Sequence, residues 1–421
     1  MASPEQHRIW SLGTSLRPAA FVLALAIVFV LTVGAASSTQ AQTYTVIHNF
    51  TGAEGAYPDA GLTLDKAGNL YGTASGGGST GYGTVFKLAH KASGWIVMPL
   101  YSFTGGYDGA SPLAPVTIGP DGSLYGTTIG GGYMGGNYCS QGGCGVVFSL
   151  KPGPRAPVSA LAPWTQTVLH AFTGYPYDGD QPVFGPLIFD QQGNLYGTTQ
   201  FGGNNGDFGI AFKLTPSGSG WTESILYNFG LPTNGPLSGV VMDSAGNLYG
   251  TTADGGAVFE LSPSGLSWVL AILHTFNGEN DGSLAYGGLV MDQAGNLYGA
   301  TSDGGSGHGG VVYELSPSDG GWTYQILYSL SGAGGPYGNL TLDAAGNLYG
   351  ATQSDGVNDA GMIFKLTPSN GSWTFTDLHD FSFQAEYFPY GAVALDANGN
   401  LYGTASGGGA YGDGAVWEIT P

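Results

Sequence analysis

The 421-residue sequence contains 77 glycines, 13% aromatic residues and only 9% charged residues, and its formal net charge is −20. Low charge combined with many aromatic side chains excludes an intrinsically disordered chain. The negative charge repels phosphate backbones and anionic lipid surfaces, so we expect no nucleic-acid partner and no membrane partner for the mature protein. Cations and neutral glycans are the ligands that this charge favours.

Residues 1–41 have the pattern of a secretory signal peptide. Arg8 and Arg17 precede an apolar run from Ala19 to Leu31, and small residues follow up to Ala41. A positive, an apolar and a small-residue segment in that order are typical of exported proteins. We therefore expect export to the periplasm, the cell surface or the medium, with residues 42–421 as the mature domain. The alternative is an uncleaved anchor helix, because the run approaches the ~20 residues that span a bilayer.

One motif, Leu-Tyr-Gly followed by two small residues, recurs along the rest of the chain. Its tyrosines stand 49 to 71 residues apart, at Tyr71, Tyr125, Tyr196, Tyr249, Tyr298, Tyr349 and Tyr402. A period of about 50 residues is typical of propeller blades. Each copy predicts four short strands, with an Asp-x-x-Gly-Asn turn after the first, a glycine-rich loop after the second and a Thr-Pro or Ser-Pro turn after the third. This pattern predicts an all-β fold, a seven-bladed β-propeller of four-stranded antiparallel blades.

The order of the strands predicts how the ring closes. A strand of the fourth kind, Thr43–Phe50, precedes the first complete repeat, and the last repeat stops after its third strand, Ala415–Pro421. We expect the N-terminal strand to complete the last blade, because this pairing removes two free sheet edges. Residues 42–421 would then form one domain, which we expect to be a monomer.

The second repeat departs most from the others. It carries the two cysteines, Cys139 and Cys144, and a proline-rich insertion between Lys151 and Trp164. In an exported protein, two cysteines five positions apart predict a local disulfide.

Three motifs of the repeat match a known pattern: Leu-Tyr-Gly-Thr-Thr, the Gly-Gly that follows, and Gly-x-Val-Phe-x-Leu, as in Gly145 to Leu150. In these motifs the chain resembles the Gloeo/Verruco (GloVer) tandem-repeat family of exported bacterial proteins. The resemblance covers nearly all of the mature chain and implies export and a propeller-like fold, but no biochemical activity. More loosely, Asp-x-x-Gly-Asn-Leu-Tyr is similar to the turn and strand of NHL-type and streptogramin-lyase-type propellers.

Candidate ligand-binding residues lie in the loops that join the fourth strand of one repeat to the first strand of the next. In a propeller these loops share one face, here called the varied face, with the loops between second and third strands. Their acidic and aromatic side chains suit sugar binding or Ca²⁺ coordination, although Asp-Gly and Tyr-Pro are also ordinary turn chemistry. The candidates are Tyr57, Asp59, Asp108, Asp178, Asp180, Asp281, Tyr286, Tyr337 and Tyr390.

Four histidines, His48, His170, His274 and His379, occupy one position of the repeat. Because they are expected on separate blades, they cannot converge on one ion, and we interpret them as packing residues. The sequence indicates no catalytic residues, since no nucleophile elbow precedes a helix. It identifies no cofactor, and Ca²⁺ is the ion that the acidic loops suit.

We therefore expect an exported or cell-envelope propeller that binds glycans or surface proteins through the varied face. Two alternatives stay open. One is a lyase-like or lactonase-like enzyme that uses carboxylates and a divalent ion at the channel mouth. The other is a purely structural envelope protein.

Overall fold

The computed structural model describes residues 42–92, 94–135, 139, 142–153, 164–182, 184–218, 220–231, 235–252, 256–332 and 334–421. The expected signal peptide and most of the proline-rich insertion lie outside the described residues. Among the described residues, no helix has the length and apolarity needed to cross a membrane. Residues Thr43–Thr420 form one compact unit.

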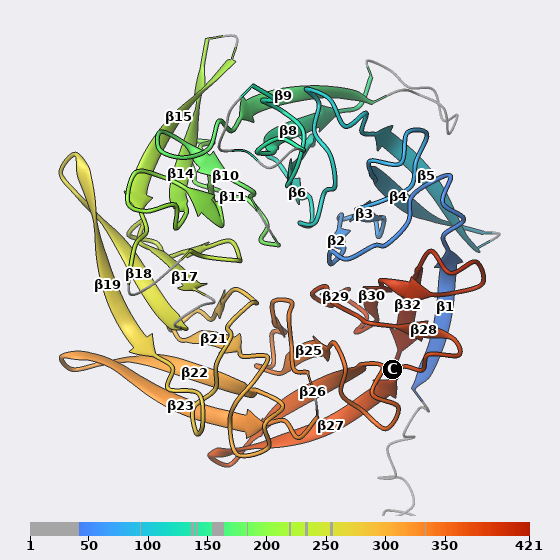
Figure 1. The fold of residues 1–421 in the computed structure, drawn as a ribbon. Coiled ribbons are helices and arrows are strands. Elements are labelled where there is room, and N and C mark those ends of the chain that lie inside the picture. The colour runs from blue at the N-terminus through green and yellow to red at the C-terminus, as the bar shows by residue number, and fades with distance from the viewer. Residues whose placement is uncertain are drawn as a thin grey trace, which may run out of the picture. The chain divides into compact units, whose positions relative to one another are not determined.

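Within the described residues, this unit consists of seven antiparallel sheets of four strands, numbered here as blades 1 to 7 (Figure 1). Blade 1 contains β2 (Thr63–Leu64), β3 (Leu70–Ala74), β4 (Thr84–Lys91) and β5 (Gly94–Ser102). Blade 2 contains β6 (Thr117–Ile118), β7 (Leu124–Thr128), β8 (Val146–Lys151) and β9 (Thr165–Ala171). Blade 3 contains β11 (Ile188–Phe189), β12 (Leu195–Thr198), β14 (Ile210–Ser217) and β15 (Gly220–Asn228). Blade 4 contains β16 (Val241–Met242), β17 (Leu248–Thr252), β18 (Ala257–Ser264) and β19 (Ser267–Thr275). Blade 5 contains β20 (Val290–Met291), β21 (Leu297–Ala300), β22 (Val311–Ser318) and β23 (Gly321–Ser329). Blade 6 contains β24 (Thr341–Leu342), β25 (Leu348–Thr352), β26 (Met362–Ser369) and β27 (Ser372–Asp380).

Blade 7 closes the ring as predicted. It contains β29 (Ala394–Leu395), β30 (Leu401–Ala405) and β32 (Ala415–Thr420), and its fourth strand is the N-terminal β1 (Thr43–Asn49). The β1–β32 ladder runs from Thr43 opposite Thr420 to Asn49 opposite Ala415. Because the first and the last strand of the described chain pair with each other, both strands have a partner where the ring closes.

Each blade is filled by an aromatic ring that lies over the glycine of its Leu-Tyr-Gly motif. In blade 4, Gly250 lies opposite Phe259, and a Cβ at Gly250 would stand 2.6 Å from Phe259 Cζ. Phe259 is fully buried. The third strands of the other blades place Phe86, Phe148, Phe212, Tyr313, Phe364 and Trp417 at the equivalent position. The motif therefore requires glycine because a cross-strand ring occupies the space of its side chain.

The third and fourth strands form longer hairpins than the sequence predicted. The expected turn at Thr215–Pro216 is part of the ladder, in which Pro216 lies opposite Trp221. The tryptophan then reaches the neighbouring blade, where its ring meets the ring of Tyr125 edge to face at 6.2 Å. Trp95, Trp322 and Trp373 make the same contact with Tyr402, Tyr249 and Tyr298. Tyrosine and tryptophan of the repeat thus join consecutive blades.

A bulge recurs between the third and fourth strands of every blade. In blade 2 the register shifts between Val147 and Phe148, so that Val147 lies opposite His170 and Phe148 opposite Val168. The same shift occurs in the other six blades. The residue after the bulge is His or Tyr, and in several blades its ring contacts the next blade, as His274 does with Tyr324.

The face opposite the varied face, here called the turn face, carries the Asp-x-x-Gly-Asn turns. In blade 3, Asp190 accepts hydrogen bonds from the backbone of Gln192 and Asn194, from the Asn194 side chain and from the Tyr196 hydroxyl. The equivalent aspartates of five other blades bind their own turns in the same way, at Asp65, Asp243, Asp292, Asp343 and Asp396. In blade 2 a glycine, Gly119, takes this position, and Asp121 two residues later accepts hydrogen bonds from Ser123 and from the Tyr125 hydroxyl. These aspartates are structural, as the sequence pattern predicted.

Candidate functional site

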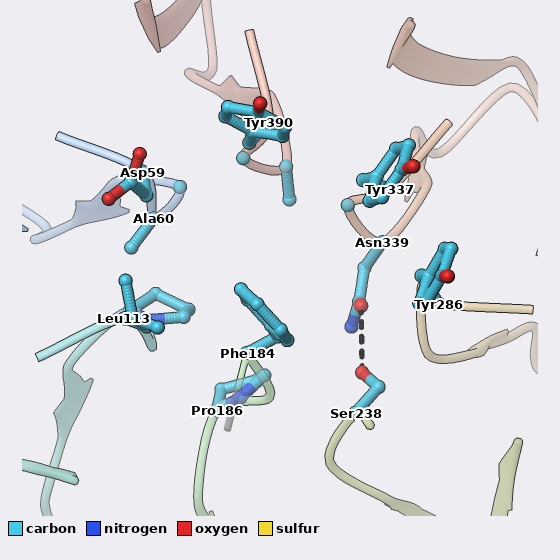
Figure 2. Close-up of a pocket in the computed structure, with 15 residues that line it drawn as sticks. Asp59, Ala60, Leu113, Phe184, Pro186, Ser238, Tyr286, Tyr337, Asn339 and Tyr390 are labelled. Carbon is cyan, nitrogen blue, oxygen red and sulfur yellow. Dashed lines mark hydrogen bonds between the residues drawn. The ribbon is translucent and has the colours of Figure 1, made fainter. Parts of the chain in front are cut away.

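A cavity of about 370 Å³ lies at the centre of the varied face, where the loops that precede the first strands converge (Figure 2). All seven blades contribute to it. Its lining includes Asp59, Leu113, Phe184, Ser238, Tyr286, Tyr337, Asn339 and Tyr390, together with small residues beside them. We call it the central cavity.

The loops that present these side chains are held in an unusual backbone conformation. Tyr57, Ser111, Gln181, Leu284 and Phe388 have φ between 53° and 60°, a region that side chains other than glycine rarely adopt. Each carbonyl accepts a hydrogen bond of 3.0–3.2 Å from the backbone at the end of the second strand in the blade that follows. Such conformations persist only where surrounding contacts hold them, and they cluster at binding sites.

Glycines let these loops meet near the centre. A Cβ at Gly391 would stand 2.3 Å from the backbone nitrogen of Gly61, and one at Gly338 would stand 2.7 Å from the backbone of Gly391. Backbone therefore packs directly on backbone from blade to blade. A larger residue at these positions would separate the loops and widen the cavity floor.

Three tyrosines form one side of the central cavity. The rings of Tyr286 and Tyr337 stack with centroids 4.7 Å apart and an interplanar angle of 8°. Tyr390 meets Tyr337 edge to face at 5.8 Å, and its hydroxyl accepts a hydrogen bond of 2.9 Å from Gln353 Nε2. The sequence predicted all three as ligand-binding residues, and the structure brings them together.

Polar groups in the central cavity are few and preorganised. Asp59 accepts hydrogen bonds of 2.6 Å from the hydroxyls of Ser75 and Ser406. Burial raises the pKa of Asp59, although both serine hydrogen bonds act in the opposite direction. Asn339 Oδ1 accepts from the Ser238 hydroxyl at 3.2 Å and from the Gly288 amide at 2.7 Å, which fixes the orientation of its amide.

The other predicted residues do not line the central cavity. Asp108 accepts hydrogen bonds from Tyr101 and from the Thr104 amide, both at 2.9 Å, and so holds its own loop. Asp281 does the same through His274 and Asn277. Tyr57 is half exposed at the rim and contributes its carbonyl to the backbone arrangement described above.

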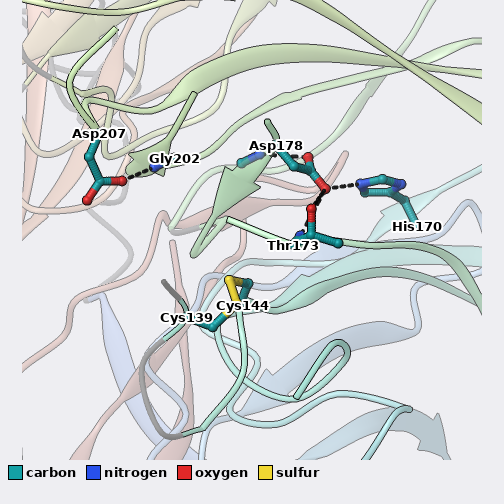
Figure 3. The surroundings of a disulfide bond; sticks show 8 residues. Cys139, Cys144, His170, Thr173, Asp178, Gly202 and Asp207 are labelled. Atoms are coloured by element: carbon teal, nitrogen blue, oxygen red, sulfur yellow. Dashed lines mark hydrogen bonds and ion pairs between the residues drawn. A yellow bond between two sulfur atoms is a disulfide. The ribbon is translucent and has the colours of Figure 1, made fainter. Parts of the chain in front are cut away.

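Asp178 lies near the disulfide of blade 2 (Figure 3). Cys139 and Cys144 form the predicted bond, and the carbonyl of Cys144 accepts a hydrogen bond from the Gln181 amide. Asp180 belongs to a small ladder that sequence reasoning missed, in which β10 (Gly179–Asp180) pairs with β13 (Phe201–Gly202). A similar ladder joins β28 (Glu386–Tyr387) to β31 (Gly407–Gly408).

Sequence reasoning also missed several residues of the central cavity, including Leu113, Phe184, Ser238 and Asn339. They lie two to four residues ahead of a first strand, close to the loop positions of Asp59, Tyr286 and Tyr390. Alignment of the loops on the first strands would have found them. A search for acidic and aromatic residues alone did not find them, because three of these four residues are neither acidic nor aromatic.

The model of the Gloeobacter/Verrucomicrobia repeat matches residues 33–257, 135–337 and 254–421 in overlapping segments. No curated protein sequence matches the chain.

Solved structures with the same fold include the extracellular domain of a proposed one-component system from B. thetaiotaomicron, with a TM-score of 0.54, 11% identity and 90% of this chain covered. The matched region spans 40% of that protein's chain. A fungal alcohol oxidase in complex with copper gives a TM-score of 0.53 at 13% identity, with 91% of this chain and 77% of that chain covered. An ulvan lyase gives 0.48 at 11% identity, with 86% and 94% covered. At such identity, the likeness concerns the fold alone.

Proposed function

The chain belongs to the Gloeobacter/Verrucomicrobia repeat family, and we propose that this member is an exported binding module that holds a neutral glycan in its central cavity. The observation that carries the proposal is the convergence of Tyr286, Tyr337 and Tyr390 with a few oriented polar groups at one point. Export rests on the signal-peptide pattern of residues 1–41.

The composition of the central cavity supports a sugar rather than a charged ligand. Tyrosine rings offer flat apolar faces for the C–H side of a sugar ring, and their hydroxyls can bind its polar edge. Asp59 and Asn339 supply hydrogen-bonding groups for hydroxyls, and both are already held by neighbours. A cavity of about 370 Å³ falls in the lower part of the ~300–1,000 Å³ range of small-molecule sites. It therefore suits the end of a short oligosaccharide better than a folded protein surface.

Charge supports the same choice. The protein carries a formal net charge of −20, and the described residues that line the central cavity include no lysine or arginine. Anionic polysaccharides would be repelled on approach and would find no cation in the lining. Neutral polymers such as glucans, mannans and xylans are the ligand class that remains.

The described lining gives less support to a lyase or lactonase. Metal-assisted chemistry requires several carboxylate or similar ligands around one ion. Asp59 is the one carboxylate among the described residues that line the central cavity, and serines already occupy both of its oxygens. The binding hypothesis needs no further group.

The test is calorimetric titration of the purified protein with neutral oligosaccharides, after a screen of neutral and anionic polysaccharides. We expect saturable binding of a neutral glycan and at least about tenfold weaker affinity in Tyr337→Ala, since a central aromatic contact is worth about 1.4 kcal/mol or more.

Tyr177→Ala is the matched control, because Tyr177 is an exposed tyrosine on the same face that does not line the central cavity. Equal loss in Tyr177→Ala and Tyr337→Ala, or preferential binding of anionic polysaccharides, would contradict the proposal.

A further inference from the structure

Side chains of two blades meet at the junction between blades 2 and 3, at the periphery of the ring. His170 lies on β9 and Glu223 on β15, and Asp178 lies in the loop that leads to β10. His170 Nε2 stands 3.0 Å from Asp178 Oδ2 and 3.6 Å from Glu223 Oε2. The three candidate ligand atoms all lie within 4.8 Å of one another. None of the three residues lines the central cavity.

The other junctions show that Glu223 is the exceptional member. Its register partner is Leu214, and the residues in the same register elsewhere are Tyr44, Val97, Gln166, Leu270, Tyr324 and Phe375. At the junction of blades 4 and 5, for example, Tyr324 stacks on His274 at 3.9 Å and no second carboxylate is present among the contacts of that histidine. The repeat therefore supplies a histidine–carboxylate pair at several junctions, and blade 3 alone adds a second acid.

This arrangement has an excess of acidic groups, because a protonated His170 can balance the charge of only one of its two carboxylates. The two carboxylates share one imidazole, and Glu223 Oε1 is inaccessible to solvent with no hydrogen-bond partner among the described residues. A buried acceptor without a partner is costly in a structure that has no use for it.

We propose that His170, Asp178 and Glu223 bind one divalent transition-metal ion, with Zn²⁺ as the best match. Around a tetrahedral ion with bonds of about 2.0 Å, ligand atoms stand on the order of 3.3 Å apart, and the two separations given above bracket this value. An imidazole nitrogen with two carboxylate oxygens suits Zn²⁺ or Mn²⁺, whereas Ca²⁺ takes oxygen ligands alone.

The surroundings of Asp178 resemble the support that metal ligands receive. The Thr173 amide donates to Asp178 Oδ2 at 2.9 Å, and the Gly179 amide donates to Oδ1 at 2.6 Å. These bonds fix the carboxylate before any ion arrives. Side-chain exposures of 21% at His170 and 15% at Glu223 leave an entry path. The ion would link blade 2 to blade 3 directly beside the Cys139–Cys144 loop.

The experiment is equilibrium dialysis and calorimetry with Zn²⁺, Mn²⁺ and Ca²⁺ on the full protein, purified without a polyhistidine tag, with its disulfide intact, and stripped with a chelator. We expect one tightly bound Zn²⁺ per chain, a higher melting temperature on binding, and at least tenfold weaker affinity in His170→Gln and in Glu223→Gln. Substitution by Co²⁺ should produce visible absorption bands in the wild type that both variants lose.

His274→Gln is the matched control, because His274 has the same repeat position and a carboxylate partner but no second acid. Zn²⁺ affinity should be unchanged in this variant. The proposal is overturned if the wild type binds no stoichiometric transition metal, if Ca²⁺ binds more tightly than Zn²⁺, or if His170→Gln binds Zn²⁺ as tightly as His274→Gln. The His170→Gln comparison suffices if Glu223→Gln does not fold.

Discussion

The aspartates of the turn face and three buried carboxylates at or beside the varied face have pKa shifts of opposite direction. Glu54, in a loop of the varied face, behaves like the turn aspartates, because hydrogen bonds from Thr51 outweigh its burial and lower its pKa. On the turn face, burial tends to raise the pKa of Asp190, but hydrogen bonds from Asn194, Tyr196 and Gln192 outweigh it, and the pKa lies below its usual value. Asp65, Asp121, Asp243 and Asp343 show the same direction. At the varied face and the blade junction beside it, burial raises the pKa of Asp59, Asp180 and Glu223.

The direction of the pKa shift helps to separate structural from functional acids in a repeat protein. A carboxylate whose pKa is lowered is more stable as an ion in the folded state, and so it contributes to folding. A carboxylate whose pKa is raised weakens the folded state when it ionises. Groups of the second kind are retained for another reason, and perturbed acids of this kind cluster at functional sites. In this molecule they include Asp59 at the central cavity, Asp180 and Glu223 near the junction between blades 2 and 3, and Asp377 on β27.

The largest effect is expected from the glycine that the repeat keeps under its aromatic ring. Gly250→Ala should lower the free energy of unfolding by about 3 kcal/mol, because the new methyl group would stand 2.6 Å from Phe259 Cζ and 3.2 Å from Val240 Cγ1. Urea unfolding followed by tryptophan fluorescence measures the change. The double variant Gly250→Ala/Phe259→Leu should lose less free energy of unfolding than the two single variants lose in sum, since the smaller side chain removes the clash. Strict additivity would show that the ring is not the reason for glycine.

An intermediate effect is expected at the turn face. Asp190→Ala should lower the free energy of unfolding by about 2 kcal/mol, because four donors lose their charged acceptor. Gln191→Ala in the same turn is the control, since its side chain is exposed, and it should change stability by less than about 0.5 kcal/mol. Glycan binding should be unaffected in both. If the aspartate variant were as stable as the control, the assignment of these acids to structure would be wrong.

The smallest effect, and the one of opposite sign, is expected at the varied face. Asp180 is 6% exposed, and its Oδ1 has no hydrogen-bond partner among the described residues. Burial, together with the charges of Asp207 and Asp178, raises its pKa to about 6, against about 3.9 in an unfolded chain. The folded state therefore loses stability as the pH rises from about 4 to 6, and Asp180→Asn removes this loss.

Asp180→Asn should accordingly match the wild type at pH 4 and exceed its free energy of unfolding by about 1 kcal/mol at pH 8, after allowance for solvent screening. Thermal unfolding across this pH range measures the difference. Asp190→Asn should behave in the opposite way, with a loss at pH 8 that shrinks as the pH falls below about 4. Parallel pH profiles for the two variants would remove the distinction between the faces.

Much of the fold could be predicted because seven copies of the repeat show the same pattern of turns and strands. The turn at Asp65, the closing strand from Thr43 and the Cys139–Cys144 bond each depend on residues close in sequence or on the order of strands. Strand ends were less accurate. Pro216 was expected in a turn, but it pairs with Trp221 in a hairpin whose outer edge does not need the missing amide.

The candidate site was only partly predictable. Asp59 and Asp108 look alike in sequence, since each follows a tyrosine in a loop with glycines nearby. Asp59 lines the central cavity, whereas Asp108 accepts hydrogen bonds from Thr104 in its own loop. Composition cannot separate these outcomes, because both suit an acidic group equally well.

The sequence by itself determined the blade, the number of blades, the closure of the ring and the structural role of the turn aspartates. These properties follow from hydrogen bonds and packing within one repeat, and the same interactions recur from copy to copy. The tertiary structure alone decided which side chains meet across blades. Glu223 and His170 are 53 positions apart, and Tyr286 and Tyr390, which both contact Tyr337, are 104 positions apart. Their contacts depend on the angle between neighbouring blades and on the closed ring, and no local pattern in the chain encodes that geometry.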